Sequence, residues 1–349
     1  MEFPKYYWKE DSPENQGLHS GKVNEAMTFL EKHVGSDGVR EAVIVRNGYL
    51  IWKGDNIDRK HCVMSCTKSF ASTVLGILID DGKCTLNTLA ADYVPDLKKD
   101  YPDVTLRHFA TMTSGYQSEG PYYYGEVDPI EGSSNYLKPA KPLFKPGEIF
   151  SYWDNAMRKF GQVLTAIAGE PIDEFFRRRV AEPIGMVNWS WEYDGFPRQI
   201  PPEMYGIKDA AAGVEITARD LARFGHLFLN KGNWDGKQIV SESWVEQITK
   251  PQVPTTIGRN LYSARQRSIE GRGIYSFNWW LNGVKPDGKR LLPGAPKGTF
   301  FASGYNDNRC FIIPEWNMVV VRMGTNRNSP HDSEFWGEFL RLLGQAIID

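Results

Sequence analysis

Apolar residues recur with the period of an α-helix near the start of the chain and again at its end. Ser20 precedes the first of these segments, and we expect it to cap a helix there. The final segment, SEFWGEFLRLLGQAIID (333–349), has the same spacing, so both helices should pack one face on another layer. The apolar positions are Val23, Ala26, Met27, Leu30 and Val34 in the first helix and Phe335, Trp336, Phe339, Leu342, Leu343 and Ala346 in the last.

Short runs of β-branched and aromatic residues lie between these two terminal helices in the sequence. In EAVIVRNGYLIWKGD two such runs flank Asn47 and Gly48, the strongest short signal for a β-hairpin. Four more runs, GIYSFNWWL, TFFASGY, RCFII and NMVVVRMGT, occupy residues 273–325 and are separated by Gly, Pro and Asn. A turn is expected from Pro314 to Asn317. Strands are therefore predicted at both ends of the chain.

The middle of the chain is helical or loop-like. VTLRHFATMTSG (104–115) predicts a short helix, and two further helices are separated by Gly169 and Pro171. Thr217 and Asp220 have the spacing of a helix start. We predict an α/β (α+β) fold, in which an antiparallel sheet flanked by helices is completed by both termini. Residues 1–84 and 205–349 would form this sheet domain, and residues 85–204 a mainly helical inserted domain.

Composition narrows the class of protein. The chain has 349 residues, of which 41% are hydrophobic and 24% charged, as expected of a globular protein. The formal net charge is -2 and no basic run occurs, so nucleic acid is not an expected partner. No apolar stretch reaches the roughly 20 residues of a membrane helix. The charged, aromatic N-terminus is not a signal peptide, which predicts a cytoplasmic protein, or a periplasmic or secreted one if a leader precedes this sequence.

Metal-binding and disulfide patterns are absent from the sequence. The four cysteines form no C-x-x-C pair, and so few cysteines in a chain of this length do not indicate a disulfide framework. The six histidines are scattered, with no H-E-x-x-H spacing. We therefore expect neither a metal site nor a cofactor.

A lysine at the start of an apolar helix is the first residue that indicates a catalytic function. In HCVMSCTKSFASTVLGILIDDGK (61–83), Ser65 and Lys68 stand three residues apart, which makes them neighbours on a helix. Burial would lower the pKa of Lys68. A neutral amine there could act as general base on the serine hydroxyl. The alternative is a surface lysine on an ordinary first turn.

Five further segments in fixed order give this motif a context. They are VTLRHFATMTSGY, KPGEIFSYWD, AEPIGM, AAAGVEITARDLARFGHLFLNKG and FFASGYNDNRCFIIPEWNMVVVRM. With Ser65-Cys66-Thr67-Lys68, the set resembles the serine β-lactamase and penicillin-recognising enzyme superfamily from about residue 40 to 325. It is most similar to the class C β-lactamase-like group, which includes esterases, D-aminopeptidases and 6-aminohexanoate-dimer hydrolases. The resemblance implies a β-lactamase/DD-peptidase-like fold, with the active site in the cleft between the two domains.

The resemblance implies a role for each matching residue. Ser65 would be the acylated nucleophile, while Lys68 and Tyr152 would share its proton and return it to the leaving group. The backbone N–H groups of Ser65 and Tyr305 would form the oxyanion hole. No metal or organic cofactor is implied.

The second motif departs from the family pattern. It usually ends in asparagine, but here it reads Tyr152-Trp153-Asp154. A carboxylate at this place would favour protonated Lys68 and could leave Tyr152 as the principal base. The alternative is that Asp154 points away and caps a turn.

The resemblance also implies that the strand from Phe301 to Tyr305, which includes Ser303 and Gly304, lines one wall of the cleft. The third motif, in this strand, departs from the family pattern as well. It usually reads K-T-G or H-x-G, but here it is Ala302-Ser303-Gly304, which lacks the cationic or imidazole side chain. In the antibiotic-directed members that lysine helps to hold the substrate carboxylate. Ala302 therefore argues against efficient hydrolysis of penicillins or cephalosporins, and it favours the esterase and amide-hydrolase branches.

Aromatic residues are candidates for the walls of the cleft. Tyr123 belongs to a tyrosine-rich loop where the family has its rim, and tyrosine both stacks and hydrogen-bonds. Covering the helical domain is the alternative role for that loop. Trp153 is expected to face the cleft or its floor, whereas Trp279 and Trp280 are expected in the sheet core, with substrate contact as the lesser option.

These observations favour a serine hydrolase that cleaves a carboxylic ester or amide of a small molecule through a Ser65 acyl-enzyme. One alternative is a β-lactamase or D,D-peptidase acting on β-lactams or peptidoglycan-like peptides. Another, motivated by the altered second and third motifs, is a non-catalytic binding or sensor protein on the same scaffold. The oligomeric state is left open.

Overall fold

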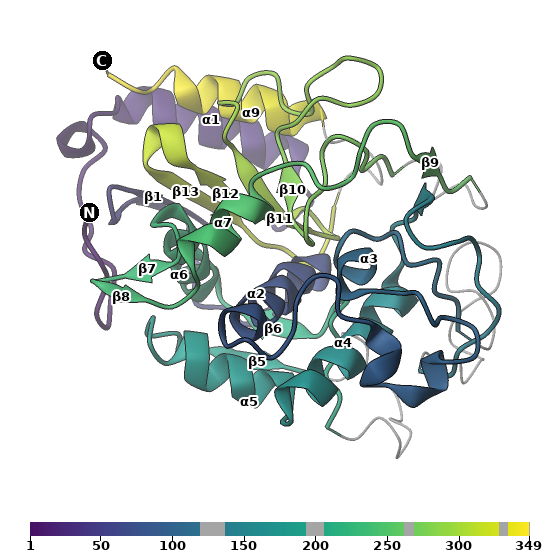
Figure 1. The fold of residues 1–349 in the computed structure, drawn as a ribbon. Coiled ribbons are helices and arrows are strands. Elements are labelled where there is room, and N and C mark those ends of the chain that lie inside the picture. The colour runs from purple at the N-terminus through teal and green to yellow at the C-terminus, as the bar shows by residue number, and fades with distance from the viewer. Residues whose placement is uncertain (119–136, 193–205, 262–268, 328–333, 349) are drawn as a thin grey trace.

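A six-stranded antiparallel sheet lies at the centre of the computed structural model (Figure 1), which describes residues 1–118, 137–192, 206–261, 269–327 and 334–348. Strand β1 pairs with β13, so strands from the two ends of the chain are neighbours. This confirms the predicted antiparallel sheet flanked by helices. In spatial order the strands are β10 (Trp280–Leu281), β11 (Phe300–Gly304), β12 (Asn308–Ile313), β13 (Met318–Arg322), β1 (Ala42–Arg46) and β2 (Tyr49–Lys53).

The two faces of the sheet bury two separate apolar clusters. In β13, Val319 and Val321 belong to one cluster, whereas Met318 and Val320 belong to the other. This alternation follows from the two-residue period of a strand. Because both faces are covered, β13 and β1 are apolar almost throughout.

The two predicted turns are both present. Asn47 and Gly48 have φ angles of 54° and 87°, as a two-residue hairpin with the right-handed twist of β1 and β2 requires. Residues Pro314–Trp316 form a short 3₁₀ turn between β12 and β13, and Asn317 follows with a φ of 47°.

Helices from the two ends of the chain cover one face of the sheet. Helices α1 (Ser20–His33) and α9 (Glu334–Gly344) lie side by side there (Figure 1), and α2 (Thr67–Asp80) and α6 (Ala218–Leu229) lie on the other face. The predicted cap was wrong in detail, because Ser20 is the first residue of α1 and His19 precedes it. The carboxylate of Glu14 accepts a hydrogen bond from the Ser20 N–H at 2.9 Å.

A second group of helices packs beyond α2. It contains α3 (Leu106–Ala110), α4 (Asp154–Ala168) and α5 (Ile172–Phe176), with α7 (Glu242–Ile248) nearer the sheet (Figure 1). A three-stranded sheet joins β3 (His61–Cys62), β6 (Val214–Ile216) and β5 (Trp189–Trp191). Two short pairs complete the strands: β4 (Ile149–Phe150) with β9 (Gly258–Arg259), and β7 (Asn233–Trp234) with β8 (Lys237–Gln238).

The run predicted as a strand over 273–281 is mostly irregular. Only Trp280–Leu281 is a strand, because the chain turns back at Asn278, whose φ is 60°, and Tyr275 bridges to Trp280. Within the described ranges, no helix combines the length and the apolar character needed to cross a membrane.

Candidate active site

Ser65 lies in a single 3₁₀ turn, Met64–Cys66, that joins β3 to α2. Met64 has a φ of 52°, an uncommon conformation for a residue other than glycine, and so the chain bends sharply just before the serine. Ser65 is partly exposed, whereas Lys68 in the first turn of α2 is buried. The turn thus presents the Ser65 hydroxyl at the start of α2, while the Lys68 amine is shielded from water.

Three oxygen atoms surround the Nζ atom of Lys68. The Ser65 Oγ lies at 2.8 Å, the Ala211 carbonyl oxygen at 2.9 Å and the Asp154 Oδ1 at 2.7 Å. As an ammonium, Lys68 donates to the Ser65 and Ala211 oxygens and is ion-paired with Asp154. When the amine is neutral, the Ala211 carbonyl and the Asp154 carboxylate, which can only accept, take its N–H groups. A neutral amine has two N–H groups, and its lone pair is then directed at the Ser65 hydroxyl. The geometry therefore suits proton transfer from Ser65 to Lys68.

The charges around Lys68 act in opposite directions. Burial lowers the pKa of Lys68, because the charged ammonium loses its hydration. The carboxylate of Asp154 opposes this and supports the charged form, with a smaller contribution from Asp209. Burial prevails, and the pKa of Lys68 lies below its ordinary value.

Asp154 is the first residue of α4 and is buried beside Lys68. Of the two alternatives for Asp154, the structure excludes the one in which the side chain points away from the lysine. A carboxylate is also favoured at this end of a helix, where the free N–H groups carry positive potential. Trp153 precedes the helix and is buried in the core.

The ring of Tyr152 lies over Lys68, with 4.9 Å between the lysine Nζ and the ring centroid. Tyr152 is buried and packs against Tyr275 and Trp280, at centroid distances of 6.1 and 5.7 Å. Ser65, Lys68 and Tyr152 are therefore brought together. Trp280, expected mainly in the sheet core, is half-buried and borders the site, whereas Trp279 is fully buried.

A buried ion pair holds the carbonyl that Lys68 contacts. Arg158 Nε lies 3.2 Å from Asp209 Oδ2, and the other oxygen of Asp209 accepts a hydrogen bond from the Ala211 N–H at 2.7 Å. This fixes the turn whose Ala211 carbonyl faces the lysine. Sequence reasoning missed these residues, although Ala211 lies in one of the segments that carried the family resemblance.

The end of β11 lies directly on the serine turn. A Cβ atom added to Gly304 would lie 2.1 Å from the Val63 carbonyl oxygen and 3.2 Å from the Cys66 nitrogen, so only glycine allows this approach. The next residue, Tyr305, therefore has its backbone beside Ser65. Ala302, at the usual place of a lysine, is fully buried.

Three side chains of neighbouring strands hold successive carbonyls of the turn after β11. Arg309 donates to the Gly304 carbonyl at 2.8 Å, Asn308 to the Tyr305 carbonyl at 2.7 Å, and Arg322 to the Asn306 carbonyl at 2.6 Å. Since C=O and N–H point in opposite directions across a peptide, the Arg309 contact also orients the Tyr305 N–H. No pattern in the sequence predicted these three contacts.

The remaining candidates lie at the rim. Ser303 is partly exposed and stands opposite Arg309 across β11 and β12. The Tyr305 side chain is exposed, with the Arg327 guanidinium carbon 3.7 Å from its ring centroid. Tyr123 falls outside the described residues. Over the described residues, no group of three or more His, Cys, Asp or Glu side chains is placed to hold a metal ion.

Comparisons with known proteins show the family to which the chain belongs. The family model described as Beta-lactamase matches residues 37–345. The 6-aminohexanoate-dimer hydrolase of Paenarthrobacter ureafaciens is 22% identical over 293 residues, which cover 77% of this chain and 67% of that protein.

Solved structures share the fold at low sequence identity. A family VIII carboxylesterase superposes with a TM-score of 0.66 at 18% identity, covering 94% of this chain and 97% of the other. A class C β-lactamase from Rhodobacter sphaeroides gives a TM-score of 0.60 at 17% identity, covering 93% and 99%. Since the family model spans most of the sequence, the chain belongs to the β-lactamase family of serine hydrolases.

Proposed function

We propose that this protein cleaves a carboxylic ester or an amide of a small molecule through an acyl-enzyme on Ser65. The observation that carries the proposal is the 2.8 Å contact between the Lys68 amine and the Ser65 hydroxyl, in a site where Lys68 is buried and Ser65 is accessible. A cleft between a sheet domain (1–84 and 205–349) and a helical domain (85–204) is part of the same proposal.

In the first step, the lone pair of Lys68 takes the Ser65 proton while the serine oxygen attacks the carbonyl carbon. The N–H groups of Ser65 and Tyr305 receive the oxyanion, and preorganised donors of this kind contribute about 3 kcal/mol each to transition-state stabilisation. Lys68 and Tyr152 return the proton to the departing alcohol or amine. Water then attacks the acyl-enzyme, and the same groups move its proton back to Ser65.

Two features favour esters and unstrained amides over β-lactams. Ala302 supplies no cation for a substrate carboxylate, and Arg309 on the adjacent strand is already engaged with the Gly304 and Asn308 carbonyls. The relatives include a protein named for hydrolysis of an amide dimer and another named a carboxylesterase. These names support the proposed bond types.

The decisive experiment is labelling with a fluorophosphonate, which reacts with an activated serine. We expect the wild-type protein to be labelled, and the Ser65→Ala and Lys68→Ala variants to remain unlabelled while keeping the wild-type circular dichroism spectrum. A wild-type protein that the fluorophosphonate does not label would favour the binding or sensor alternative. Hydrolysis of p-nitrophenyl acetate without turnover of nitrocefin would separate the esterase and amidase proposal from a β-lactamase.

A further inference from the structure

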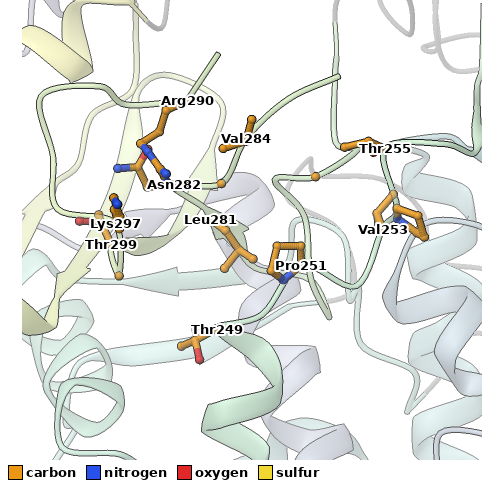
Figure 2. A pocket seen from close by; sticks show the side chains of 14 residues that line it. Thr249, Pro251, Val253, Thr255, Leu281, Asn282, Val284, Arg290, Lys297 and Thr299 are labelled. Atoms are coloured by element: carbon orange, nitrogen blue, oxygen red, sulfur yellow. Dashed lines mark hydrogen bonds between the residues drawn. The ribbon is translucent and has the colours of Figure 1, made fainter. Parts of the chain in front are cut away.

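A cavity of about 600 Å³, drawn in Figure 2, opens beside the start of β11. The Ser65 turn lies at the opposite end of that strand. Thr299 lines the cavity, and Gly304, five residues on, lies against the Ser65 turn. At about 3.3 Å per residue, these two positions are roughly 16 Å apart. The cavity is therefore separate from the candidate active site, and its volume suits a small molecule.

One side of the cavity is cationic. Arg290 and Lys297 lie on the same side of it (Figure 2), and none of its described lining residues is Asp or Glu. Glu315, on the nearby β12–β13 turn, does not line the cavity and accepts a hydrogen bond from the Gly298 N–H at 2.7 Å. The Lys297 side chain makes no ion pair or hydrogen bond with other described residues, so its charge is available to a ligand.

A buried polar atom lacks a partner at this place. Thr299 is 1% exposed, and its hydroxyl has no hydrogen-bond partner among the described residues. An unsatisfied buried hydroxyl is destabilising, so a ligand oxygen that bonded to it would recover part of that cost. Because Thr299 lines the cavity, its hydroxyl is a candidate partner for a polar ligand group beside the two cations.

The loop that carries the cations is fixed in place. Asn282 is buried, and its amide group donates to the carbonyls of Ala295 and Pro296 at 3.1 and 2.9 Å. Its side-chain oxygen accepts a hydrogen bond from the Leu292 N–H at 2.8 Å. Arg290 also donates to the Asn282 carbonyl oxygen. These contacts hold the loop in one conformation, which reduces the entropic cost of binding.

The remaining wall is apolar. Leu281 and Val284 line it on one strand segment, and Pro251 and Val253 line it from the segment after α7 (Figure 2). A molecule that fits both halves carries one anionic oxygen group and a short hydrocarbon portion. We propose that this cavity is a second binding site, which takes a small amphipathic carboxylate with its head at Arg290, Lys297 and Thr299. This inference does not depend on the proposed hydrolase activity.

The test is a titration of the full chain, carrying labelled methyl groups on Leu and Val, with sodium hexanoate. We expect the methyl resonances of Val253, Leu281 and Val284 to shift with a Kd on the order of 1 mM, as befits so small a ligand. Hexanol, which lacks the charge, and acetate, which lacks the hydrocarbon portion, should each bind at least about 5-fold more weakly.

Charge-removing variants make the test specific. Lys297→Gln should weaken hexanoate binding about 5-fold or more without changing the fold, because a cation at a carboxylate contributes about 1 kcal/mol or more. Lys285→Gln is the matched control, since Lys285 is ion-paired with Asp287 and does not line the cavity. No shift of these methyl groups at about 10 mM hexanoate, ten times the expected Kd, would overturn the proposal. So would equal binding of hexanol, or unchanged affinity in Lys297→Gln.

Discussion

The carboxylate of Asp154 lies 2.7 Å from the Nζ atom of Lys68, in the place where the second motif of the family usually has an asparagine amide. A neutral amide would accept from the lysine without adding charge. The carboxylate instead raises the pKa of Lys68 against the lowering caused by burial. The pH range in which the amine is neutral therefore depends on Asp154.

Replacing Asp154 by asparagine should shift the acid limb of the kcat/KM profile to lower pH. Without the carboxylate, the pKa of Lys68 falls further below its ordinary value, because the opposite charge that supports the ammonium is lost, so the neutral amine persists at lower pH. Asp96→Asn is a suitable control, because the Asp96 carboxylate is ion-paired at 2.7 Å with another lysine, Lys159 of α4. An unchanged acid limb in Asp154→Asn would show that Lys68 is not the group whose titration limits the reaction.

Gly304→Ala should reduce kcat about 100-fold, because the new methyl group displaces either the Val63 carbonyl or the Tyr305 backbone and so disturbs the oxyanion hole. Overpacking here should also cost about 1–3 kcal/mol of unfolding free energy. Steady-state kinetics with p-nitrophenyl acetate and denaturant unfolding measure both effects. The control is Gly21→Ala in α1, where no atom lies within 4 Å of the added Cβ. Equal activity of the two variants would contradict the close approach.

Asn308→Ala should lower kcat about 10-fold to 100-fold with little change in KM, because an oxyanion donor that is no longer held in place is worth less. Asn308 donates to the Tyr305 carbonyl and accepts from the Gly324 N–H at 2.9 Å. Asn233→Ala, in strand β7, controls for the general loss of an asparagine that accepts a hydrogen bond from a backbone N–H. If Asn308→Ala lost stability but kept full kcat, the contact would be purely structural.

His226 should make the protein less stable as the pH falls from about 6.5 to about 4. Burial lowers the pKa of His226 to about 4, so the folded state binds a proton less readily than the unfolded state. Neutral His226 makes its full contribution to the unfolding free energy above pH 6.5. As the pH falls toward 4 this contribution is lost progressively, and the loss is at most about 3 kcal/mol. The neutral ring packs against Phe3 and Trp8 and lies 2.9 Å from the Glu2 carbonyl oxygen.

Urea unfolding of the wild-type protein and His226→Gln at several pH values measures this effect. Glutamine does not titrate, so the difference in unfolding free energy between the two proteins should narrow as the pH falls. A constant difference between pH 7 and pH 4.5 would refute a buried neutral histidine.

Local parts of the site could be predicted from the sequence because they depend on spacing alone. Ser65 and Lys68 are three residues apart, and a single turn of chain brings them together. The contacts that complete the site come from far along the chain, as with the Ala211 carbonyl, which is 143 residues from Lys68. No periodicity carries that information, and the family resemblance supplied only the segments in which such residues lie.

The fold was predictable at the level of layers, since the terminal helices and the hairpin at Asn47 have strong local signals. Strand β10 was predicted too long, because the turn at Asn278 depends on tertiary packing. The boundaries of the two domains, at residues 84 and 205, stay a prediction.

The pairing of β1 with β13 determines when the central sheet can form during synthesis. On the ribosome, β1 emerges early and has only β2 as a sheet partner until nearly the whole chain has been synthesised, because Val45 pairs with Val319. Long-range pairing of this kind is slow and leaves apolar strand surface exposed in the meantime. The central sheet can therefore be completed only after translation has passed the codons of β13.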